Sequence, residues 1–240
     1  MAENKGYSID VTKKKCVSPE CRGSYVHILE PEMTLTNQED PDSKKIPVWN
    51  MQCIFPKSPT VNKWVEELKQ IYAQTLTDKF DAKKAGEIAK IIMAKKRFPL
   101  RDGDNPADTI ELKNAEQLEG CYFLTSKNKF RQPHIIGVMG KAVDPETLTP
   151  DDIYSGAWYR AMLEFWYYDV KGNKGISTTL VAVMKTKDGD SLGGGTSKSE
   201  ATTAFSDFAE EAASMFTAES EESVETPEET KSEKKTFDFL

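Results

Sequence analysis

Apolar and polar residues alternate along several segments of the chain with the period of two that is typical of half-buried β-strands. Near the start, Tyr7, Ile9 and Val11 fall on one face, with polar residues between them. The same alternation, bounded by turn-forming residues, predicts further strands over residues 24–29, 46–55, 120–126, 133–139, 156–168 and 176–186.

Between the third and fourth of these strands, residues 60–96 follow a helical period instead. Thr60 is a suitable N-cap for a first helix, whose apolar stripe runs over residues 61–76. Asp81 can cap a second helix, whose apolar stripe runs over residues 85–93. We expect both stripes to face the core, and we expect an irregular loop over residues 97–116.

The outer face of the second predicted helix is basic. A solvated surface is the default interpretation, and accessory contact with phosphate groups is the alternative. This face carries Lys83, Lys84, Lys90, Lys95, Lys96 and Arg97.

Strands on both sides of a helical insertion, without regular alternation of strands and helices, argue against a parallel doubly wound sheet. A mainly β fold with a helical insertion at about residues 60–96 fits better. The architecture we expect is a partly open β-barrel of the OB type, formed by residues 1–190.

Charge changes abruptly near residue 190. The chain has a formal net charge of −7, but residues 1–190 carry 28 Lys and Arg against 27 Asp and Glu, whereas residues 191–240 carry 4 against 12. A run of three glycines follows the change, and the remainder has too little apolar content for a core. We therefore expect residues 191–240 to form a flexible acidic tail, in which a marginal amphipathic helix could form over residues 202–216.

The tail ends in an aromatic tip that has no neighbours in sequence with which to build a core. An acidic segment followed by apolar side chains is typical of a peptide ligand for a basic, grooved partner, although a merely solubilising tail would look similar. The predicted partner-binding residues are Phe237, Asp238, Phe239 and Leu240.

Residues 154–177 carry the most informative pattern. As a strand, one face is apolar throughout and suits the core, from Tyr159 to Tyr167. The opposite face places large aromatics around an arginine, which is unusual on a solvated strand unless something stacks there. The alternative is a second packed layer, in which the helical pair covers this face. Single-stranded nucleic acid is a suitable partner, because every base offers a π-face that can stack on such rings. The predicted DNA-binding residues here are Trp158, Arg160, Trp166 and Tyr168.

Basic residues near turns extend the candidate site, because a groove that follows a phosphate backbone needs cations with interleaved aromatic rings. Lys127, Lys129 and Arg131 flank Phe130 just after a predicted strand, and Lys174 lies in the tight turn of residues 172–175. Lys57 is a further candidate.

Other chemistry has weaker support. Cys16 and Cys21 could form half of a zinc site, but no second close pair follows, so buried reduced thiols are the expected state and no metal or cofactor is predicted. Asp102, Asp104 and Asp108 could hold Mg²⁺ for a nuclease, but their segment also has the composition of an ordinary turn. No phosphate-binding loop or nucleophile motif is present, so we expect a protein that is not an enzyme.

Several segments, taken in order, resemble a family of tailed-bacteriophage single-stranded-DNA-binding proteins: residues 54–59 (IFPKSP), 120–133 (GCYFLTSKNKFRQP), 154–177 and the acidic tail. The resemblance implies an OB-type domain that coats single strands without sequence preference during phage DNA replication, recombination and repair. It also implies a tail that recruits replication proteins (polymerase, helicase/primase or recombinase) and competes with DNA for the groove. By position, Trp158, Trp166 and Tyr168 match aromatic positions of the family, whereas Arg160 falls where a smaller polar residue is more usual.

The residues leave alternatives open. An adaptor that acts only through its tail, without binding DNA, would bury Trp158 and Trp166, and an RNA-binding protein would use the same residues as a DNA-binding one. We expect no membrane association, a monomer or homodimer, and action in the cytoplasm of the infected bacterial host.

Overall fold

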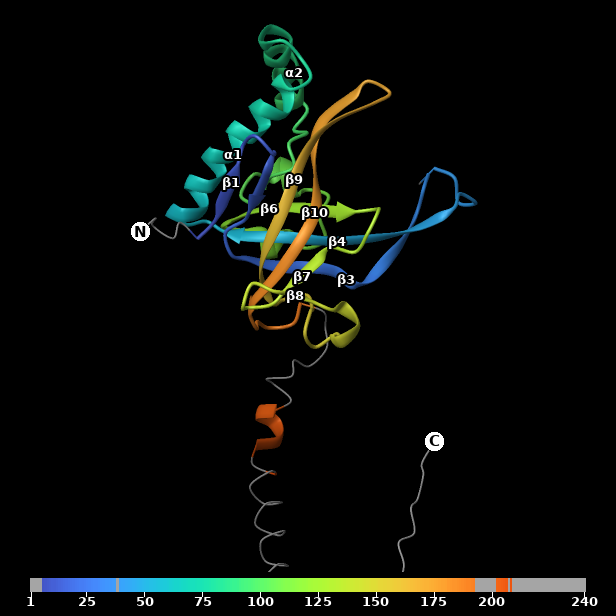
Figure 1. Cartoon of the computed structure of the whole chain (residues 1–240), viewed down its shortest axis with the longest axis vertical. Coiled ribbons are helices and arrows are strands. Elements are labelled where there is room, and N and C mark those ends of the chain that lie inside the picture. Colours follow the sequence, from blue (N-terminus) through green and yellow to red (C-terminus); the bar gives the residue numbers. More distant parts are fainter. Residues whose placement is uncertain (1–5, 38, 193–201, 207, 209–240) are drawn as a thin grey trace, which may run out of the picture. The chain divides into compact units, whose positions relative to one another are not determined.

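The computed structural model describes residues 6–37, 39–192, 202–206 and 208. The chain divides into two compact units, Met1–Gly195 and Thr196–Leu240. Every strand and helix labelled in Figure 1 belongs to the first unit. In the second unit, residues 202–206 and 208 are helical, as expected for part of residues 202–216, and the aromatic tip lies outside the described residues.

Ten strands in the described part of the first unit form one sheet. They are β1 (Ser8–Asp10), β2 (Lys15–Val17), β3 (Cys21–Leu35), β4 (Lys45–Pro56), β5 (Arg101–Asp102), β6 (Cys121–Asn128), β7 (His134–Ile136), β8 (Ala142–Val143), β9 (Trp158–Val170) and β10 (Asn173–Lys187).

Five of these strands close into a barrel. The neighbours run β9–β3–β4–β6–β10, and β10 pairs with β9 again. The β6–β10 contact is parallel and the other pairs are antiparallel. A five-stranded barrel of this kind is the OB-type architecture expected from the sequence. Strands β2 and β8 have only three and two residues, too few for alternation to reveal them.

Figure 1 shows β3 and β4 crossing β9 and β10 at a steep angle, and both hairpins extend beyond the barrel. Thr179 of β10 pairs with β6, but residues closer to the turn pair within the hairpin only with β9. We call this outer part of the hairpin, residues 165–178, the arm.

Two helices lie against one side of the arm and the barrel: α1 (Pro59–Thr77) and α2 (Ala82–Ala94). The Tyr72 and Phe165 rings are 5.7 Å apart, and the Phe80 and Tyr167 rings are 5.3 Å apart. The helices therefore cover the face of β9 that the sequence assigned to the core, and they leave the Trp166 face free.

The helix caps differ in one detail from the prediction. Asp81 caps α2 as expected, with its carboxylate accepting from the Lys84 amide at 2.9 Å. The cap of α1 is Ser58 and not Thr60, because Pro59 occupies the first helical position, where no N–H is needed. Met93, expected in the apolar stripe of α2, is exposed.

The predicted loop after α2 contains short elements. These are β5, α3 (Pro106–Thr109) and the 3₁₀ turn η1 (Ala115–Leu118), and a second 3₁₀ turn, η2 (Pro145–Thr147), follows β8. None of the helices that the structure describes is long and apolar enough to cross a membrane.

Candidate nucleic-acid interface

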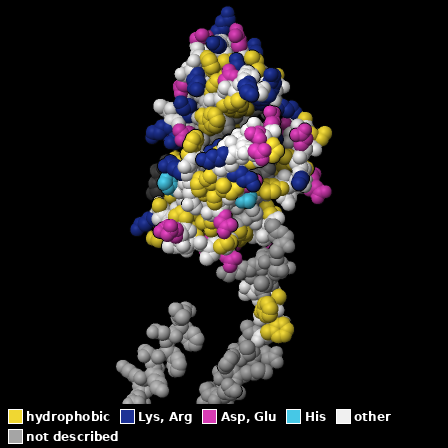
Figure 2. Space-filling model, turned by 90° about the vertical axis from the view of Figure 1, so that its right-hand side faces the viewer, with side chains coloured by type: hydrophobic (Ala, Val, Ile, Leu, Met, Phe, Trp, Pro, Cys, Tyr) yellow, Lys and Arg dark blue, Asp and Glu magenta, His cyan; other side chains and the backbone are white. Residues whose placement is uncertain are grey.

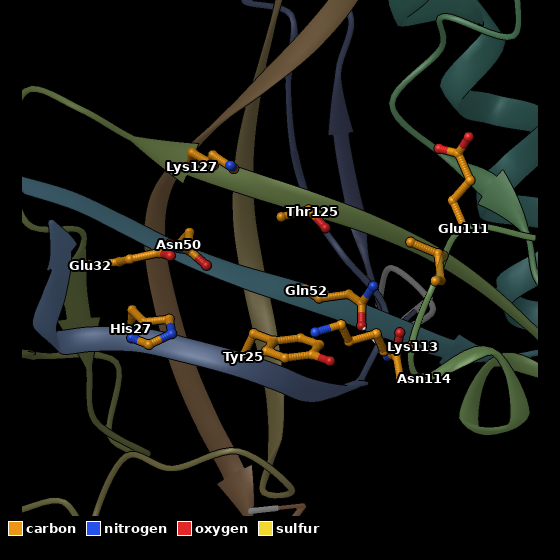
Figure 3. A pocket seen from close by; sticks show the side chains of 11 residues that line it. Tyr25, His27, Glu32, Asn50, Gln52, Glu111, Lys113, Asn114, Thr125 and Lys127 are labelled. Carbon is orange, nitrogen blue, oxygen red and sulfur yellow. Dashed lines mark hydrogen bonds between the residues drawn. The ribbon is translucent and has the colours of Figure 1, made fainter. Parts of the chain in front are cut away.

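An open groove with a volume of about 330 Å³ crosses the outer surface of β3, β4 and β6. Its walls also include the segment that precedes η1 (Figure 3). The side chains that line this groove are polar or aromatic with one exception: Tyr25, His27, Glu32, Asn50, Gln52, Glu111, Leu112, Lys113, Asn114, Thr125 and Lys127.

Strand alternation explains why polar side chains meet here. On β4, Met51 and Cys53 point into the barrel, so Asn50 and Gln52 point to the outer face. The β4–β6 register then places Asn50 opposite Lys127 and Gln52 opposite Thr125. Paired residues share a face of the sheet, and two strands therefore supply the floor of the groove.

Tyr25 enters the groove through an irregularity in β3. The register between β3 and β4 shifts between Ser24 and His27, and Tyr25 has a φ of 48°, in the left-handed region. The Ser155 hydroxyl accepts a hydrogen bond from the next amide, that of Val26, at 3.0 Å. A bulky residue in this conformation stores strain, and such strain is concentrated at functional sites. The ring that results is 50% exposed.

Hydrogen bonds hold the polar side chains on the floor of the groove in place, whereas the lysines that line it form no ion pair with the described residues. The Asn50 side-chain amide donates to Glu32 at 3.1 Å, and that of Asn114 donates to Gln52 at 2.7 Å. Lys113 lies beside the Tyr25 ring in Figure 3. Among the residues that the structure describes, no carboxylate forms an ion pair with Lys113 or Lys127 (the acids Glu32 and Glu111 lie elsewhere on the lining).

The β6–β7 loop (residues 129–133) adjoins the groove. The side-chain oxygen of Asn128 (Oδ1) accepts from the amides of Phe130 and Arg131 at 3.0 and 3.1 Å, and its side-chain NH₂ donates to the Leu180 carbonyl. Gln132 donates to the carbonyl of Ile28, one residue after His27. The loop thus holds Phe130 with 92% of its surface exposed between two exposed cations, Lys129 and Arg131.

Trp166 and Tyr168 lie on the free face of the arm. Their rings meet edge to face with centroids 6.0 Å apart, and Trp166 is 45% exposed. Thr179 pairs with Lys127 on one side and with Glu164 on the other, so these three side chains share the outer face. Trp166 is the next outward residue of β9 beyond Glu164. The outer surface around Lys127 therefore continues from β6 across β10 to β9 and the arm. This distance is two strand spacings, or about 10 Å.

The structure places the other two residues of this β9 face differently. Trp158 lies at the opposite end of β9, with the Lys187 ammonium 4.5 Å from its ring. The Arg160 guanidinium donates to the carbonyls of Gly6 and Ser18, so it ties the N-terminal segment to β9. Neither side chain lines the groove.

Lys57 and Lys174 are both engaged by carboxylates. Lys57 contacts Asp102 at 2.6 Å and Asp104 at 2.7 Å, and these hydrogen bonds raise the pKa of its ammonium. Lys57 and the Gly120 amide together lower the pKa of Asp104. Lys174 lies 3.7 Å from Asp169 in the hairpin turn. Lys57 therefore fastens the end of β4 to β5 and to the segment that follows it, and Lys57 does not line the groove.

The three aspartates that could have held Mg²⁺ in a nuclease are engaged by contacts within the fold. Asp102 and Asp104 both accept from Lys57, whereas Asp108 accepts from Asn105 at 3.1 Å and lies 3.7 Å from Lys96. The described part of the chain holds no group of three or more His, Cys, Asp or Glu side chains arranged to bind a metal ion. Cys16 and Cys21 are buried free thiols, and burial raises the pKa of Cys16 to about 12.

Sequence reasoning missed most of the groove, including Tyr25, Gln52 and Lys113. One available signal was the alternation of Asn50 and Gln52 with apolar residues along β4, which marks a polar outer face. The β3 irregularity and the segment before η1 carry no comparable periodic signal.

Comparison with known proteins supports the barrel architecture. The barrel resembles the single-stranded DNA-binding protein from bacteriophage Enc34, with a TM-score of 0.55 and 17% identity over 78% of this chain and 92% of that one. The same phage protein in complex with ssDNA gives a TM-score of 0.53 and 18% identity over 80% of this chain and 100% of that one.

The amino-acid sequence, as well as the fold, is similar to that of other phage proteins. Protein p50 of Acyrthosiphon pisum secondary endosymbiont phage 1 is 32% identical over 143 residues, which are 59% of this chain and 70% of that protein. The family profile described as "Enterobacter phage Enc34, ssDNA-binding protein" matches residues 14–215. Since this match spans well over half of the sequence, the chain belongs to that family of phage single-stranded-DNA-binding proteins.

Proposed function

We propose that this protein binds and coats single-stranded DNA without sequence preference during phage DNA replication, recombination and repair. The observation that carries the proposal is the groove, where a half-exposed aromatic ring lies among polar side chains and lysines free of ion pairs with the described residues. Every base offers a π-face to such a ring, so the contact does not depend on sequence.

The strand would run along the groove with its bases against Tyr25 and Phe130. Lys113, Lys127 and the cations of the β6–β7 loop would contact its phosphates. Beyond Lys127, the shared outer face leads across β10 to Trp166 and then Tyr168, which offer two more rings. Each stacked base contributes roughly 1–3 kcal/mol, and cation contacts make binding weaken with salt.

The acidic tail would act on the same groove and on other proteins. Ten carboxylates between Ser199 and Thr230 imitate a polyanion, and a tether keeps them at high local concentration near the cations. The tip, Phe237–Leu240, would recruit replication proteins (a polymerase, a helicase/primase or a recombinase). The protein would act in the cytoplasm of the infected host, as a monomer or homodimer.

Replacing Tyr25 tests the groove directly. Tyr25→Ala removes the ring, and we expect affinity for oligo-dT to fall about 5- to 150-fold, the equivalent of roughly 1–3 kcal/mol. Tyr25→Phe keeps the ring and should bind within about twofold of the unaltered protein. Titration with fluorescent oligo-dT measures both, with duplex DNA as the comparison ligand.

A control separates lost stacking from lost folding, because Tyr25 has a positive φ. Tyr25→Gly removes the ring but suits this backbone, so it should weaken DNA binding as much as Tyr25→Ala while retaining the unfolding temperature. Unchanged affinity of both variants would refute the assignment of the groove as the DNA site.

A further inference from the structure

The segment around α2 concentrates positive charge at a distance from the groove. Residues 79–97 contain seven Lys and Arg but only two acids, Asp81 and Glu87. Figure 2 shows Lys and Arg side chains gathered over the end of the body that carries α2. A concentration of one sign of charge raises the local concentration of an oppositely charged ligand.

Packing and capping explain why this charge stays available. Ala85, Ile88 and Ile92 occupy the buried stripe of α2, so Lys83 and Lys90 point to solvent. Lys84 is also exposed, and its ammonium lies 5.3 Å from the Phe80 ring centroid. The carboxylate of Asp81 is occupied as the helix N-cap. Among the described residues, Lys96 of this segment forms an ion pair with Asp108 at 3.7 Å, and no ion pair is found for the other cations of the segment.

Hydrogen bonds join this basic surface to the arm. The Arg97 carbonyl accepts from the Ile176 amide at 3.1 Å, and its guanidinium donates to the Asn173 side chain at 3.1 Å. Asn173 begins β10 at the turn, and Tyr168 pairs with Gly175 two residues further along. The end of α2 is thereby fixed beside the turn that follows Trp166 and Tyr168.

We propose that the outer face of α2 is a second contact surface for single-stranded DNA, which binds the phosphates of the strand after it passes the arm. This proposal rests on the proposed function of the groove. The surface carries exposed lysines without an exposed aromatic ring among its described residues, so it would hold the backbone and leave the bases free. Lys83 and Lys90 are about 10 Å apart along the helix, which suits contact with alternate phosphates of an extended strand.

Oligonucleotide length separates the two surfaces. An oligo-dT of about 8 nucleotides should fill the groove alone, whereas one of about 20 nucleotides should also reach α2, since single OB folds bind about 4–16 nucleotides. In the full chain, the triple variant Lys83→Gln, Lys84→Gln, Lys90→Gln should bind the short oligonucleotide as the unaltered protein does. With the long one, the slope of log affinity against log salt should become shallower by about 2, at about 0.7 per lost phosphate contact.

A matched variant controls for overall charge. Lys13→Gln, Lys63→Gln, Lys69→Gln removes three exposed lysines elsewhere on the same unit, and the salt slope for either length should stay near that of the unaltered protein. Circular dichroism of both triple variants verifies that the helices form, since glutamine is a good helix former.

Each outcome decides the proposal. An unchanged slope with the long oligonucleotide would overturn it, while binding of the short one would leave the groove assignment intact. An equal change for both lengths would also overturn it, and would favour the acidic tail as the occupant of α2. If the unaltered protein bound neither length, the proposed function itself would fail.

Discussion

Two kinds of region on this barrel bring a lysine near an aromatic ring, and they differ in what the lysine does. Lys57 lies 4.8 Å from the Tyr122 ring centroid while two aspartates hold its ammonium. Lys187 covers Trp158 in the same way and pairs with Glu20 at 2.8 Å. In both places the ion pair fixes the cation over the ring, so the ring is covered and the charge is used within the fold.

The groove shows the opposite arrangement, and the arm shares its exposed aromatic ring. Tyr25 and Trp166 are each about half exposed, and Lys127 of the groove forms no ion pair with the described residues. The difference teaches that neighbouring residue types do not identify a binding site in this fold. What matters is whether a carboxylate from another segment has already engaged the cation.

Charge reversal at the two lysines should give the largest contrast. Lys127→Glu replaces attraction for phosphate with repulsion, and we expect affinity for oligo-dT at low salt to fall roughly 30-fold, with an unchanged unfolding temperature. Lys57→Glu gathers three carboxylates at one place, so it should lower the unfolding temperature and leave affinity within about threefold. Thermal unfolding and oligo-dT titration of both variants measure this. The contrast between an engaged and an unengaged lysine would be wrong if Lys57→Glu lost as much affinity as Lys127→Glu while remaining folded.

The two tryptophans of β9 extend the comparison with a smaller effect. Trp166→Ala should weaken binding about fivefold, near the lower end of the range for one stacked base, because half of its ring is already covered. Trp158→Ala should change affinity less than twofold, since Lys187 and the segment at Gly189 already occupy its surroundings. Quenching of tryptophan fluorescence by oligo-dT should accordingly persist in Trp158→Ala and decrease in Trp166→Ala. The reverse pattern would place DNA at the other end of β9.

Acid titration should give the smallest effect. The pKa of Asp104 lies below its ordinary value of 3.8, chiefly because of Lys57. Its contribution to stability is therefore present above about pH 4 and is lost as the pH falls through the lowered pKa. We expect the unaltered protein to be slightly more stable than Lys57→Gln near pH 7, with the two unfolding free energies converging below about pH 4. Denaturant unfolding across this range measures them, and a constant difference would show that the pair does not titrate as inferred.

The sequence was sufficient to predict the long strands and the two long helices but not the groove. Alternation identified both faces of β9 from Tyr159 to Tyr167, because a strand reports its own pattern locally. The groove depends on which strands become neighbours, and β3, β4 and β6 meet across more than 100 residues of sequence. The role of Lys57 was hidden for the same reason, since its partners come from a segment 45 and 47 residues away.

Asn128 has a consequence for how binding begins. Its three hydrogen bonds hold the β6–β7 loop in one conformation before any ligand arrives. The conformational entropy of presenting Phe130 is therefore lost when the protein folds and not when a base stacks on the ring. A preorganised loop of this kind would let a transient encounter become a productive contact without waiting for the chain to rearrange, which suits the coating of single strands proposed above.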